Sequence, residues 1–375
     1  MVAKFMFLRA LFSLFFIFSQ TVNGFELDWE LIHYKLQQPM PSWIIEQIQE
    51  DLQPFEEINL TEALIDQTIN SVRSVPSGSL SQFVKYTLKN NQVSFQTIEA
   101  TNDPRITFVV EALNEIISHL PLPDLTFLAS LWDYYDNPLF LEKTDCPVFA
   151  ICKKKGNKKA VLYPEFRHFD YRKRLYSDID WISGAIDWKN KIPVAFWRGM
   201  SSGGHYAIDT WDQMPRSRLV LLSQEYPELV DAAFTTPYSL YEPVKTIMES
   251  YGMFKTWGYP TDFVKYNYLI SIDGNSFASN LWWQLLSNCC VLKTDSPFIE
   301  WFYKGIERNV HYIPFSLNCC DLKEKIEWLN ENEQTAFDIA ERGRTFAKEH
   351  LTNEDLIIYF YQLLQAYSKL YQGEN

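Results

Sequence analysis

The sequence has no stripe of basic residues and no low-complexity tract. Its formal net charge is −13, whereas a surface that follows a nucleic-acid backbone needs clustered Lys and Arg. We therefore expect no nucleic-acid partner. The chain has 375 residues, of which 47% are hydrophobic. This length and composition predict a globular protein with room for two domains, each with its own core.

Long hydrophobic runs are also missing, apart from one near the beginning. Residues 5–19 are almost entirely apolar but contain Arg9, and the run is shorter than a membrane span requires. The pattern predicts that segment 1–24 is a signal peptide or a short N-terminal anchor. We therefore expect the secretory pathway, with the endoplasmic reticulum lumen in a eukaryotic host and a membrane-associated or exported protein in a bacterial one. Only this segment, if uncleaved, would contact a membrane.

CxxC spacing is absent, although the sequence contains six cysteines. Its absence argues against a zinc site. In an oxidising compartment Cys146 and Cys152 could close a small loop, and one member of each doublet, at residues 289–290 and 319–320, could bridge the two strands that they end. Buried free thiols are an equal alternative.

The most informative stretch combines a strand, a polar turn, a helix and a second strand. Residues 268–272 are apolar and of strand type, the Asp-Gly-Asn-Ser run at 273–276 has turn chemistry, and residues 278–287 have helical spacing with a serine available as N-cap. Residues 289–293 then predict another strand. Such a βαβ unit directs N–H groups and a helix N-terminus at one point, which attracts phosphate. No GxGxxG or Walker pattern is present, so a turn that binds nothing is the alternative.

A second strand that ends in a glycine-rich turn lies earlier in the chain. Residues 193–197 are strand-like and run into Arg198-Gly199 and then a segment of serine and glycine that ends at Gly204. An arginine at this point can bind phosphate oxygens with its forked guanidinium, or it can pair with a surface carboxylate.

Two acidic patterns are candidates for chemistry. Asp133 follows a predicted strand over residues 125–131, and α/β folds place catalytic groups just beyond the carboxyl ends of core strands, although an aspartate there can equally cap a turn. Asp178 and Asp180 form a DxD pattern, which in one class of glycosyltransferases holds a divalent metal on the diphosphate of the donor. The surrounding segment 153–190 is rich in charged and aromatic residues and is predicted to form loops.

The remaining segments alternate between helical and strand patterns, as in an α/β protein. Strands are predicted over residues 147–151, 229–235 and 310–314, a hairpin over 83–97, and helices up to residue 119 and over 219–226, 298–303, 320–330, 333–349 and 353–371. His311, alone on an apolar strand, is interpreted as a core residue.

Five segments together resemble a known family. AFWRG, PRSRLVLLSQEYPELVDAAFT, KYNYLISIDGNSFASNLWWQLLSNCCVLK, EWFYKGIERNVHYIPF and IAERGRTFAKEHL occur in the order and spacing of the Rumi-type protein O-glucosyltransferases and the capsule-associated-protein-like group, glycosyltransferase family 90. The resemblance covers roughly residues 105–370. It implies an α/β fold of GT-B type, with two Rossmann-like domains facing a cleft and a C-terminal helix packing back across both. The implied units are an acceptor-side domain over 25–190, a UDP-sugar-binding domain over 191–335 and C-terminal helices over 336–375.

The same resemblance implies an inverting transfer of a hexose or pentose, with glucose or xylose favoured, from a UDP-sugar to a hydroxyl of a protein serine or a glycan. It implies no metal and no other cofactor. The family's catalytic aspartate matches Asp133, through the block Asp133-Tyr134-Tyr135, and its diphosphate-binding arginine matches Arg216. The donor-binding residues are then Arg198, Gly199, Ser201, Arg216, Gly274, Asn275, Ser276, Phe277, Ala278, Ser279 and Asn280.

Two positions depart from the family pattern. The donor loop of the O-glucosyltransferases ends in an arginine that faces the diphosphate, and this sequence has Asn280 there. Loss of such a charge-assisted contact costs ~2 kcal/mol, unless another cation substitutes. Met200 replaces a small polar residue. Two rival interpretations stay open. One is a metal-dependent transferase that uses Asp178 and Asp180, and the other is an inactive sugar-binding relative in which Asn280 marks a lost donor site.

Overall fold

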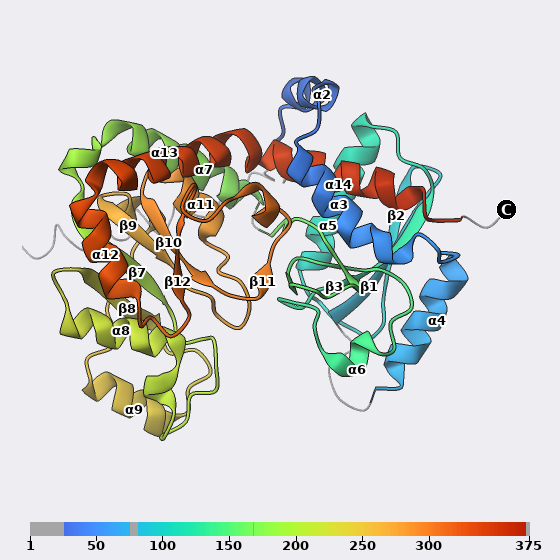
Figure 1. Cartoon of the computed structure of the whole chain (residues 1–375). Coiled ribbons are helices and arrows are strands. Elements are labelled where there is room, and N and C mark those ends of the chain that lie inside the picture. Colours follow the sequence, from blue (N-terminus) through green and yellow to red (C-terminus); the bar gives the residue numbers. More distant parts are fainter. Residues whose placement is uncertain (1–25, 76–81, 168, 373–375) are drawn as a thin grey trace, which may run out of the picture.

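The computed structural model describes residues 26–75, 82–167 and 169–372 (Figure 1). The segment 1–24, interpreted above as a signal peptide or anchor, lies outside these ranges. Within them, no helix has both the length and the apolar character needed to cross a membrane.

The first half of the chain forms a mixed five-stranded sheet in the order β2-β1-β3-β4-β6 (Figure 1). Its strands are β1 (Phe83–Lys89), β2 (Gln92–Thr97), β3 (Leu125–Ser130), β4 (Val148–Ala150) and β6 (Ala160–Leu162). The predicted hairpin over 83–97 is confirmed, and its turn residues Asn90 and Asn91 have φ angles of 52° and 56°, as a two-residue type I′ turn requires. All six residues of the central strand β3 are buried, so the segment that follows it starts from a rigid position.

Helices from both ends of the chain pack together in this half of the molecule. They are α2 (Trp29–Gln37), α3 (Ser42–Leu52) with the 3₁₀ turn η1 (Gln53–Phe55), α4 (Glu62–Arg73), α5 (Arg105–His119), α6 (Pro138–Leu141) and the last helix, α14 (Asn353–Ser368). The predicted helix up to His119 is therefore confirmed. Helix α14 contacts α2, α3 and α5, and the Tyr367 hydroxyl donates a 2.8 Å hydrogen bond to the carbonyl of Thr126 on β3. The last helix thus anchors the C-terminal end of the chain to the first sheet.

The second half forms an all-parallel sheet in the order β12-β10-β9-β7-β8. Its strands are β7 (Ile192–Met200), β8 (Val230–Thr236), β9 (Tyr266–Ser271), β10 (Cys290–Asp295) and β12 (Ile313–Ser316). Its helices and 3₁₀ turns are η3 (Trp188–Asn190), η4 (Trp211–Gln213), α8 (Pro215–Glu225), α9 (Glu242–Ser250), α10 (Pro260–Phe263), α11 (Leu281–Leu286), α12 (Leu322–Glu331) and α13 (Glu333–His350). The order is that of a doubly wound fold, in which ligands bind at the carboxyl ends of the two strands where the order reverses. Here those strands are β7 and β9.

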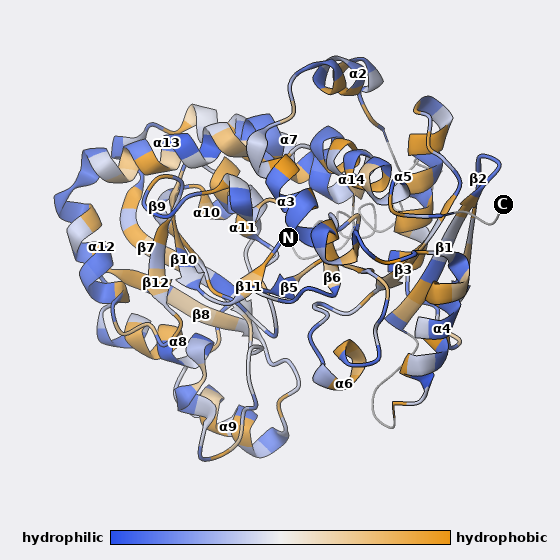
Figure 2. Ribbon diagram, turned by 45° about the vertical axis from the view of Figure 1, so that its right-hand side comes forward, coloured by the Kyte–Doolittle hydropathy of each residue, from blue (hydrophilic) through white to orange (hydrophobic). Residues whose placement is uncertain are grey.

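Apolar residues concentrate on the strands of both sheets, and the helices turn their polar faces outward (Figure 2). A two-stranded ribbon joins the halves, because β5 (Lys153–Lys154) pairs antiparallel with β11 (Phe298–Ile299). The helix predicted over 298–303 is therefore wrong. This segment forms β11 and then the 3₁₀ turn η5 (Tyr303–Gly305), because its partner strand lies in the other half, beyond the reach of a local pattern.

The prediction of loops over 153–190 is also wrong. This segment contains β5, β6 and the helix α7 (Phe169–Ala185). Phe169, Leu175 and Ile179 form the buried face of α7, and the helix packs against α10, α11 and α14. Tyr359 of α14 also packs against Trp301 of the second half, with ring centroids 4.7 Å apart, so α14 contacts both halves, as predicted. Several charged residues of α7, such as Lys173, Arg174 and Asp178, are exposed, and they obscured its narrow apolar face in the sequence.

The bridges suggested for the cysteines do not form. All six cysteines are free thiols, and five of them are buried. The alternative of buried free thiols therefore describes the structure. His311 lies in a turn before β12 and is partly exposed, so its interpretation as a core residue on a strand is wrong. Its Nδ1 atom accepts a 2.9 Å hydrogen bond from the backbone N–H of Glu307, which gives the side chain a structural partner.

A buried ion pair connects α3 to β5 of the two-stranded ribbon. The Lys153 Nζ atom lies 2.5 Å from the Asp51 carboxylate, and the two side chains are 3% and 0% exposed. The same carboxylate accepts hydrogen bonds from the Gln47 amide at 2.9 Å and from the Leu162 N–H at 2.7 Å. A buried charge pair is costly to break because either partner alone is left desolvated and unpaired.

We expect Asp51→Ala to lower the free energy of unfolding by about 3–5 kcal/mol, because it leaves the Lys153 ammonium buried without a counter-charge. Urea unfolding followed by circular dichroism measures this. Glu50→Ala is the matched control: Glu50 is the preceding residue, its side chain is 54% exposed, and it pairs with Lys304 at 2.6 Å. Breaking that surface pair costs about 1 kcal/mol or less. Equal losses in the two variants would contradict the role assigned to the buried pair.

Candidate active site

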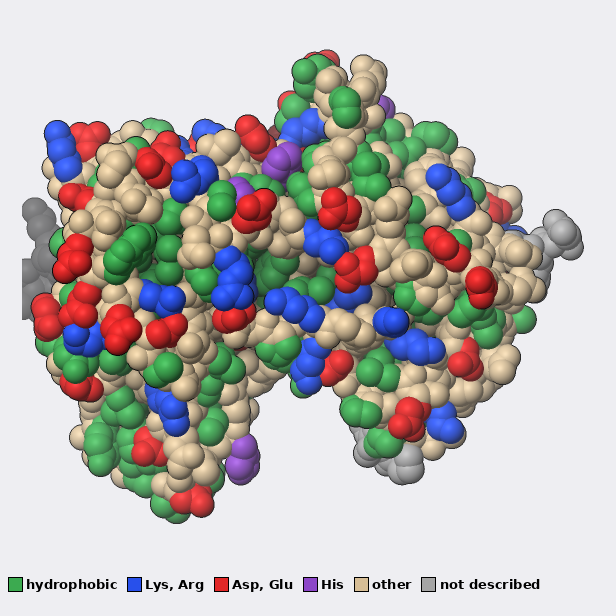
Figure 3. Space-filling model, in the orientation of Figure 1, with side chains coloured by type: hydrophobic (Ala, Val, Ile, Leu, Met, Phe, Trp, Pro, Cys, Tyr) green, Lys and Arg blue, Asp and Glu red, His purple; other side chains and the backbone are tan. Residues whose placement is uncertain are grey.

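A pocket of about 1210 Å³ lies between the two halves. The surface is hollowed where the halves meet (Figure 3). The wall from the second half is built by the segments that follow β7 and β9, and the wall from the first half includes Asp133, which follows β3, and Glu165, which follows β6. Both walls thus use carboxyl ends of parallel strands, the edge at which doubly wound sheets bind ligands.

Arg216, on the first turn of α8, holds the segments after β7 and β9 together. Its Nε atom donates to the Asp273 carbonyl at 3.1 Å and its Nη2 atom to the Ile272 carbonyl at 3.1 Å. Its Nη1 atom donates to the Met200 carbonyl at 2.9 Å and to the Ser202 hydroxyl at 2.7 Å. Burial lowers the pKa of Arg216 to about 10, so the side chain remains charged at neutral pH and provides a fixed positive charge in the pocket wall.

Gly274 lets the loop after β9 pack against this guanidinium. A Cβ atom at position 274 would lie 2.8 Å from the Ser202 hydroxyl oxygen and 2.9 Å from Nη2 of Arg216, too close for any larger residue without displacement. The neighbouring Asn275 side chain accepts a 3.0 Å hydrogen bond from the N–H of Gly203, which has a φ angle of +93°. The two strand-end loops are therefore joined along the pocket floor.

The helix after this loop differs from the prediction. It was predicted over residues 278–287 with a serine as N-cap, but α11 spans only Leu281–Leu286 and begins after Asn280, whose side chain makes no capping hydrogen bond. Residues 274–280 instead form an extended loop, and all seven line the pocket. With six residues, α11 is too short for a strong dipole, so we assign the attraction for anions to Arg216 rather than to the helix.

Arg198, Gly199 and Ser201 have structural contacts of their own. The guanidinium of Arg198 contacts both carboxylate oxygens of Asp231, at 2.9 and 3.0 Å. Two roles were considered for this arginine, phosphate binding and pairing with a carboxylate, and the structure shows the second. Gly199 also lines the pocket, on β7 rather than in a turn. Ser201 is buried, and its hydroxyl accepts a 2.7 Å hydrogen bond from the Tyr238 N–H. Ser202, not Ser201, lines the pocket.

Asp133 presents its carboxylate to the pocket from the first half. Its side chain is 54% exposed, and its nearest cationic partner is Arg105, whose Nη1 atom lies 3.8 Å away. Arg105 is itself fixed by Asp103, to which its Nε atom donates at 2.9 Å. Asp133 therefore has oxygen atoms available for a ligand, beside a positive charge that does not move.

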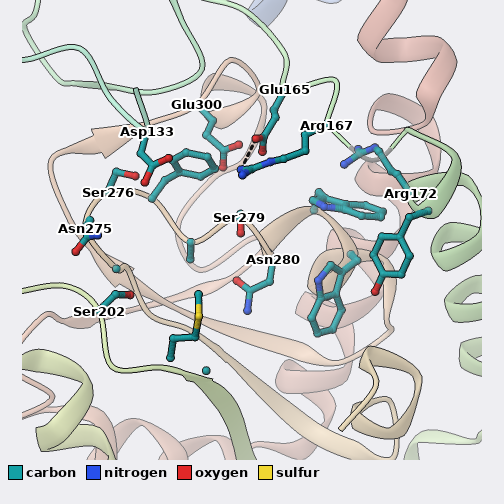
Figure 4. Close-up of a pocket in the computed structure, with 18 of the residues that line it drawn as sticks. Asp133, Glu165, Arg167, Arg172, Ser202, Asn275, Ser276, Ser279, Asn280 and Glu300 are labelled. Atoms are coloured by element: carbon teal, nitrogen blue, oxygen red, sulfur yellow. Dashed lines mark ion pairs between the residues drawn. The ribbon is translucent and has the colours of Figure 1, made fainter. Parts of the chain in front are cut away.

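Further charged residues that the sequence interpretation missed also line the pocket, among them Glu165, Arg167, Arg172 and Glu300 (Figure 4). Glu165 forms an ion pair with Arg167, and burial raises the pKa of Glu165. Arg172, on α7, stacks 3.7 Å above the ring of Trp282. Glu300 follows β11 and is discussed below. Glu165, Arg167 and Arg172 lie in the segment 153–190, which was predicted to form loops. The high density of charged residues in that segment was the only sequence signal for them.

The DxD pair lies outside this pocket. The Asp180 carboxylate contacts Arg344 at 2.8 Å and Lys348 at 3.1 Å, both on α13. Throughout residues 26–75, 82–167 and 169–372, no group of three or more His, Cys, Asp or Glu side chains is arranged to hold a metal ion. The contacts of Asp180 are those of a residue that joins α7 to α13.

We expect Asp180→Ala to lower the free energy of unfolding by about 1 kcal/mol, through the loss of two partly exposed ion pairs, and to leave UDP affinity unchanged. Urea unfolding and calorimetric titration measure the two effects. Asp178→Ala removes the other carboxylate of the pair, which is exposed, and should change neither quantity. A loss of UDP affinity in both variants would favour the metal-dependent alternative.

The fold and the pocket define the class of this protein. Two Rossmann-like halves face one cleft, and the C-terminal helix α14 packs across both of them, as in a GT-B-like protein. The profile of the family described as glycosyl transferase family 90 matches residues 38–374. The chain belongs to that family.

Named relatives agree with this assignment. Human protein O-glucosyltransferase 3 is 31% identical over 333 residues, which are 86% of this chain and 61% of the relative. Protein O-glucosyltransferase 2 of Danio rerio is 30% identical over 305 residues, 78% of this chain and 57% of the relative. The chain thus spans about three fifths of the length of these relatives. The crystal structure of Anabaena HepE with UDP and glucose aligns with a TM-score of 0.42 and 14% identity, covering 70% of this chain and 76% of HepE.

Proposed function

We propose that this protein transfers a hexose or pentose, with glucose or xylose favoured, from a UDP-sugar to a hydroxyl of a protein serine or a glycan. The observation that carries the proposal is that Asp133, from one half, and the loop 274–280 with Arg216, from the other, line a single pocket. The family supports glycosyl transfer, and the names of the O-glucosyltransferase relatives support glucose as the sugar and a protein as the acceptor.

In this proposal Asp133 is the general base of an inverting transfer. Its carboxylate takes the proton of the acceptor hydroxyl while the acceptor oxygen forms a bond to the anomeric carbon. The bond between that carbon and the diphosphate oxygen breaks from the opposite face, and UDP leaves with the electron pair. One carboxylate suffices for such a displacement, because inversion needs a base but no covalent intermediate. The exposure of Asp133 to the pocket suits this role.

Arg216 and the loop 274–280 stabilise the leaving diphosphate. The loop offers backbone N–H groups, and four hydrogen bonds fix the position of the Arg216 charge before any ligand binds. A preorganised positive charge stabilises negative charge that develops in the transition state without any cost of reorganisation. We therefore propose that the reaction needs no metal and no other cofactor.

Arg172 is our candidate for the cation that replaces the missing arginine at position 280. It lines the same pocket as Asn280, and it stacks on Trp282 of α11, two residues farther along the chain. Its Nε atom is buried and has no hydrogen-bond partner among the described residues, so a donor remains for a ligand oxygen. Burial lowers the pKa of Arg172 to about 10, and the group remains charged at neutral pH.

The location proposed for this activity follows from the donor. A UDP-sugar is available in an endoplasmic reticulum lumen, and the segment 1–24 has the pattern of a signal peptide or short anchor. We propose the lumen of the secretory pathway in a eukaryotic host. In a bacterial host a membrane-associated or exported protein is the corresponding proposal.

Calorimetric titration of UDP into the purified protein in excess EDTA tests the proposed function. We expect binding that survives chelation, followed by UDP release when UDP-glucose or UDP-xylose is supplied with an acceptor. Binding only after manganese is added would favour the metal-dependent rival. Absence of UDP binding under both conditions would contradict the proposal, and binding without any transfer would favour the inactive sugar-binding relative.

A further inference from the structure

Four carboxylates line the pocket, and they have different surroundings. Asp103 is fixed by Arg105, and Glu165 pairs with Arg167. Asp133 is the proposed base. Glu300 forms no ion pair with any described residue, although it lines the same pocket. Glu300 is therefore the carboxylate whose role the proposed reaction leaves unexplained.

The fold holds Glu300 in a defined position. It directly follows β11, which pairs with β5 across the two halves. The next residue, Trp301, is 4% exposed and packs against Trp43 and Tyr359, with ring centroids 5.9 and 4.7 Å apart. Because the backbone on both sides is fixed, the carboxylate has little freedom to leave the pocket wall.

The neighbours of Glu300 leave acceptor positions open. Burial raises the pKa of Glu300 well above its ordinary value, and the Tyr303 hydroxyl together with the charges of Lys293 and Arg172 opposes this shift. A carboxylate has about four lone-pair positions for hydrogen bonds, and one phenol cannot fill them. Glu300 is only partly buried and lines the pocket, so a ligand with several hydroxyl groups could fill the remaining acceptor positions.

The position of Glu300 in the pocket matches the position expected for the sugar of the donor. The diphosphate end is defined by Arg216 and the loop 274–280, and the reacting carbon must lie between that end and Asp133. The carboxylate of Glu165 interacts electrostatically with both Glu300 and Asp133, and Figure 4 shows the three carboxylates grouped on one side of the pocket. A sugar ring whose anomeric carbon is near Asp133 would therefore present its hydroxyls to Glu300.

We propose that Glu300 accepts hydrogen bonds from hydroxyl groups of the transferred sugar and thereby selects the donor. This inference rests on the proposed function. A site that hydrogen-bonds a substrate hydroxyl rejects analogues that lack it far more strongly than an apolar site does, so these contacts would decide which UDP-sugar is used.

The test compares Glu300→Gln with the wild-type protein. Glutamine keeps the shape but replaces one of the two acceptor oxygens with an NH2 donor. We expect kcat/KM for UDP release from UDP-glucose to fall by about 10- to 100-fold, the range for lost hydrogen bonds to a charged group, while the Kd for UDP alone changes by about twofold or less. Glu331→Gln, an exposed position on α12, is the matched control and should leave both values unchanged.

Deoxy donors separate a sugar contact from a structural role. With wild-type protein, removal of the contacted hydroxyl, in one of the UDP-deoxyglucose isomers, should lower kcat/KM by at least about tenfold; with Glu300→Gln that penalty should largely disappear. Equal penalties in both proteins, or a fall in UDP affinity that matches the fall in kcat/KM, would overturn the inference. Failure of the wild-type protein to bind UDP or consume UDP-glucose would instead overturn the proposed function.

Discussion

Replacement of Asp133 by asparagine should lower the rate of sugar transfer by about 10²–10⁴-fold, the usual contribution of a general base. Asparagine has nearly the same shape and can still hydrogen-bond the acceptor hydroxyl, but it cannot take the proton. Since Asp133 lies on the wall opposite the donor loop, the Kd for UDP should stay within about twofold of the wild-type value. Initial rates of UDP release with saturating donor measure the first effect, and calorimetry measures the second.

Asp145→Asn is the matched control for this experiment. Asp145 is exposed, lies in the same half and does not line the pocket, so its replacement should change neither rate nor affinity. If Asp133→Asn kept more than about a tenth of the wild-type rate, another group would have to remove the proton, and Glu165, in the same pocket, would be the first candidate.

Replacement of Arg216 by alanine should raise the Kd for UDP by about 10- to 100-fold, since hydrogen bonds to charged groups contribute about 1.5–3 kcal/mol each. The structure gives a second reason. Arg216 donates to the carbonyls of Met200, Ile272 and Asp273, so its loss also loosens the two loops that form the diphosphate site. Calorimetric titration in excess EDTA measures the change.

Two further variants separate charge from loop organisation. Arg216→Lys retains the charge but not the forked set of hydrogen bonds, and we expect an intermediate Kd. Arg218→Ala, an exposed position on the same helix, should bind UDP like the wild-type protein. Unchanged UDP affinity in Arg216→Ala, with the fold intact by circular dichroism, would contradict the assignment of the diphosphate site.

The sequence predicted the parts of the site that depend on local pattern. An apolar strand followed by Asp-Gly-Asn-Ser predicted the turn at 273–276, because turn residues after a strand are visible within a few positions. Asp133 was placed beyond the end of β3 for the same reason. The extent of the donor loop, up to Asn280, came from the family resemblance. The order of the strands, which brings these segments to one cleft, came from the family resemblance rather than from residue patterns.

Features that depend on distant pairing were not predictable in this way. Glu300 was assigned to a helix, whereas pairing of β11 with β5 in the other half sets its position. Arg198 was a candidate for phosphate, and only the neighbouring strand β8 supplies the Asp231 that binds it. Local spacing also overestimated the length of α11, because the extended loop before it is fixed by contacts such as that of Asn275 with Gly203.

The stereochemistry of donor hydrolysis tests the central claim most directly, because it requires no knowledge of the acceptor. Proton NMR during incubation of the protein with UDP-α-glucose in excess EDTA distinguishes the anomer that forms first, before the free sugar equilibrates. With water in place of the acceptor and Asp133 as base, β-glucose should appear first, and Asp133→Asn should suppress its formation. If α-glucose appeared first, or if the donor were consumed only with added metal, the inverting mechanism proposed for this pocket would be wrong.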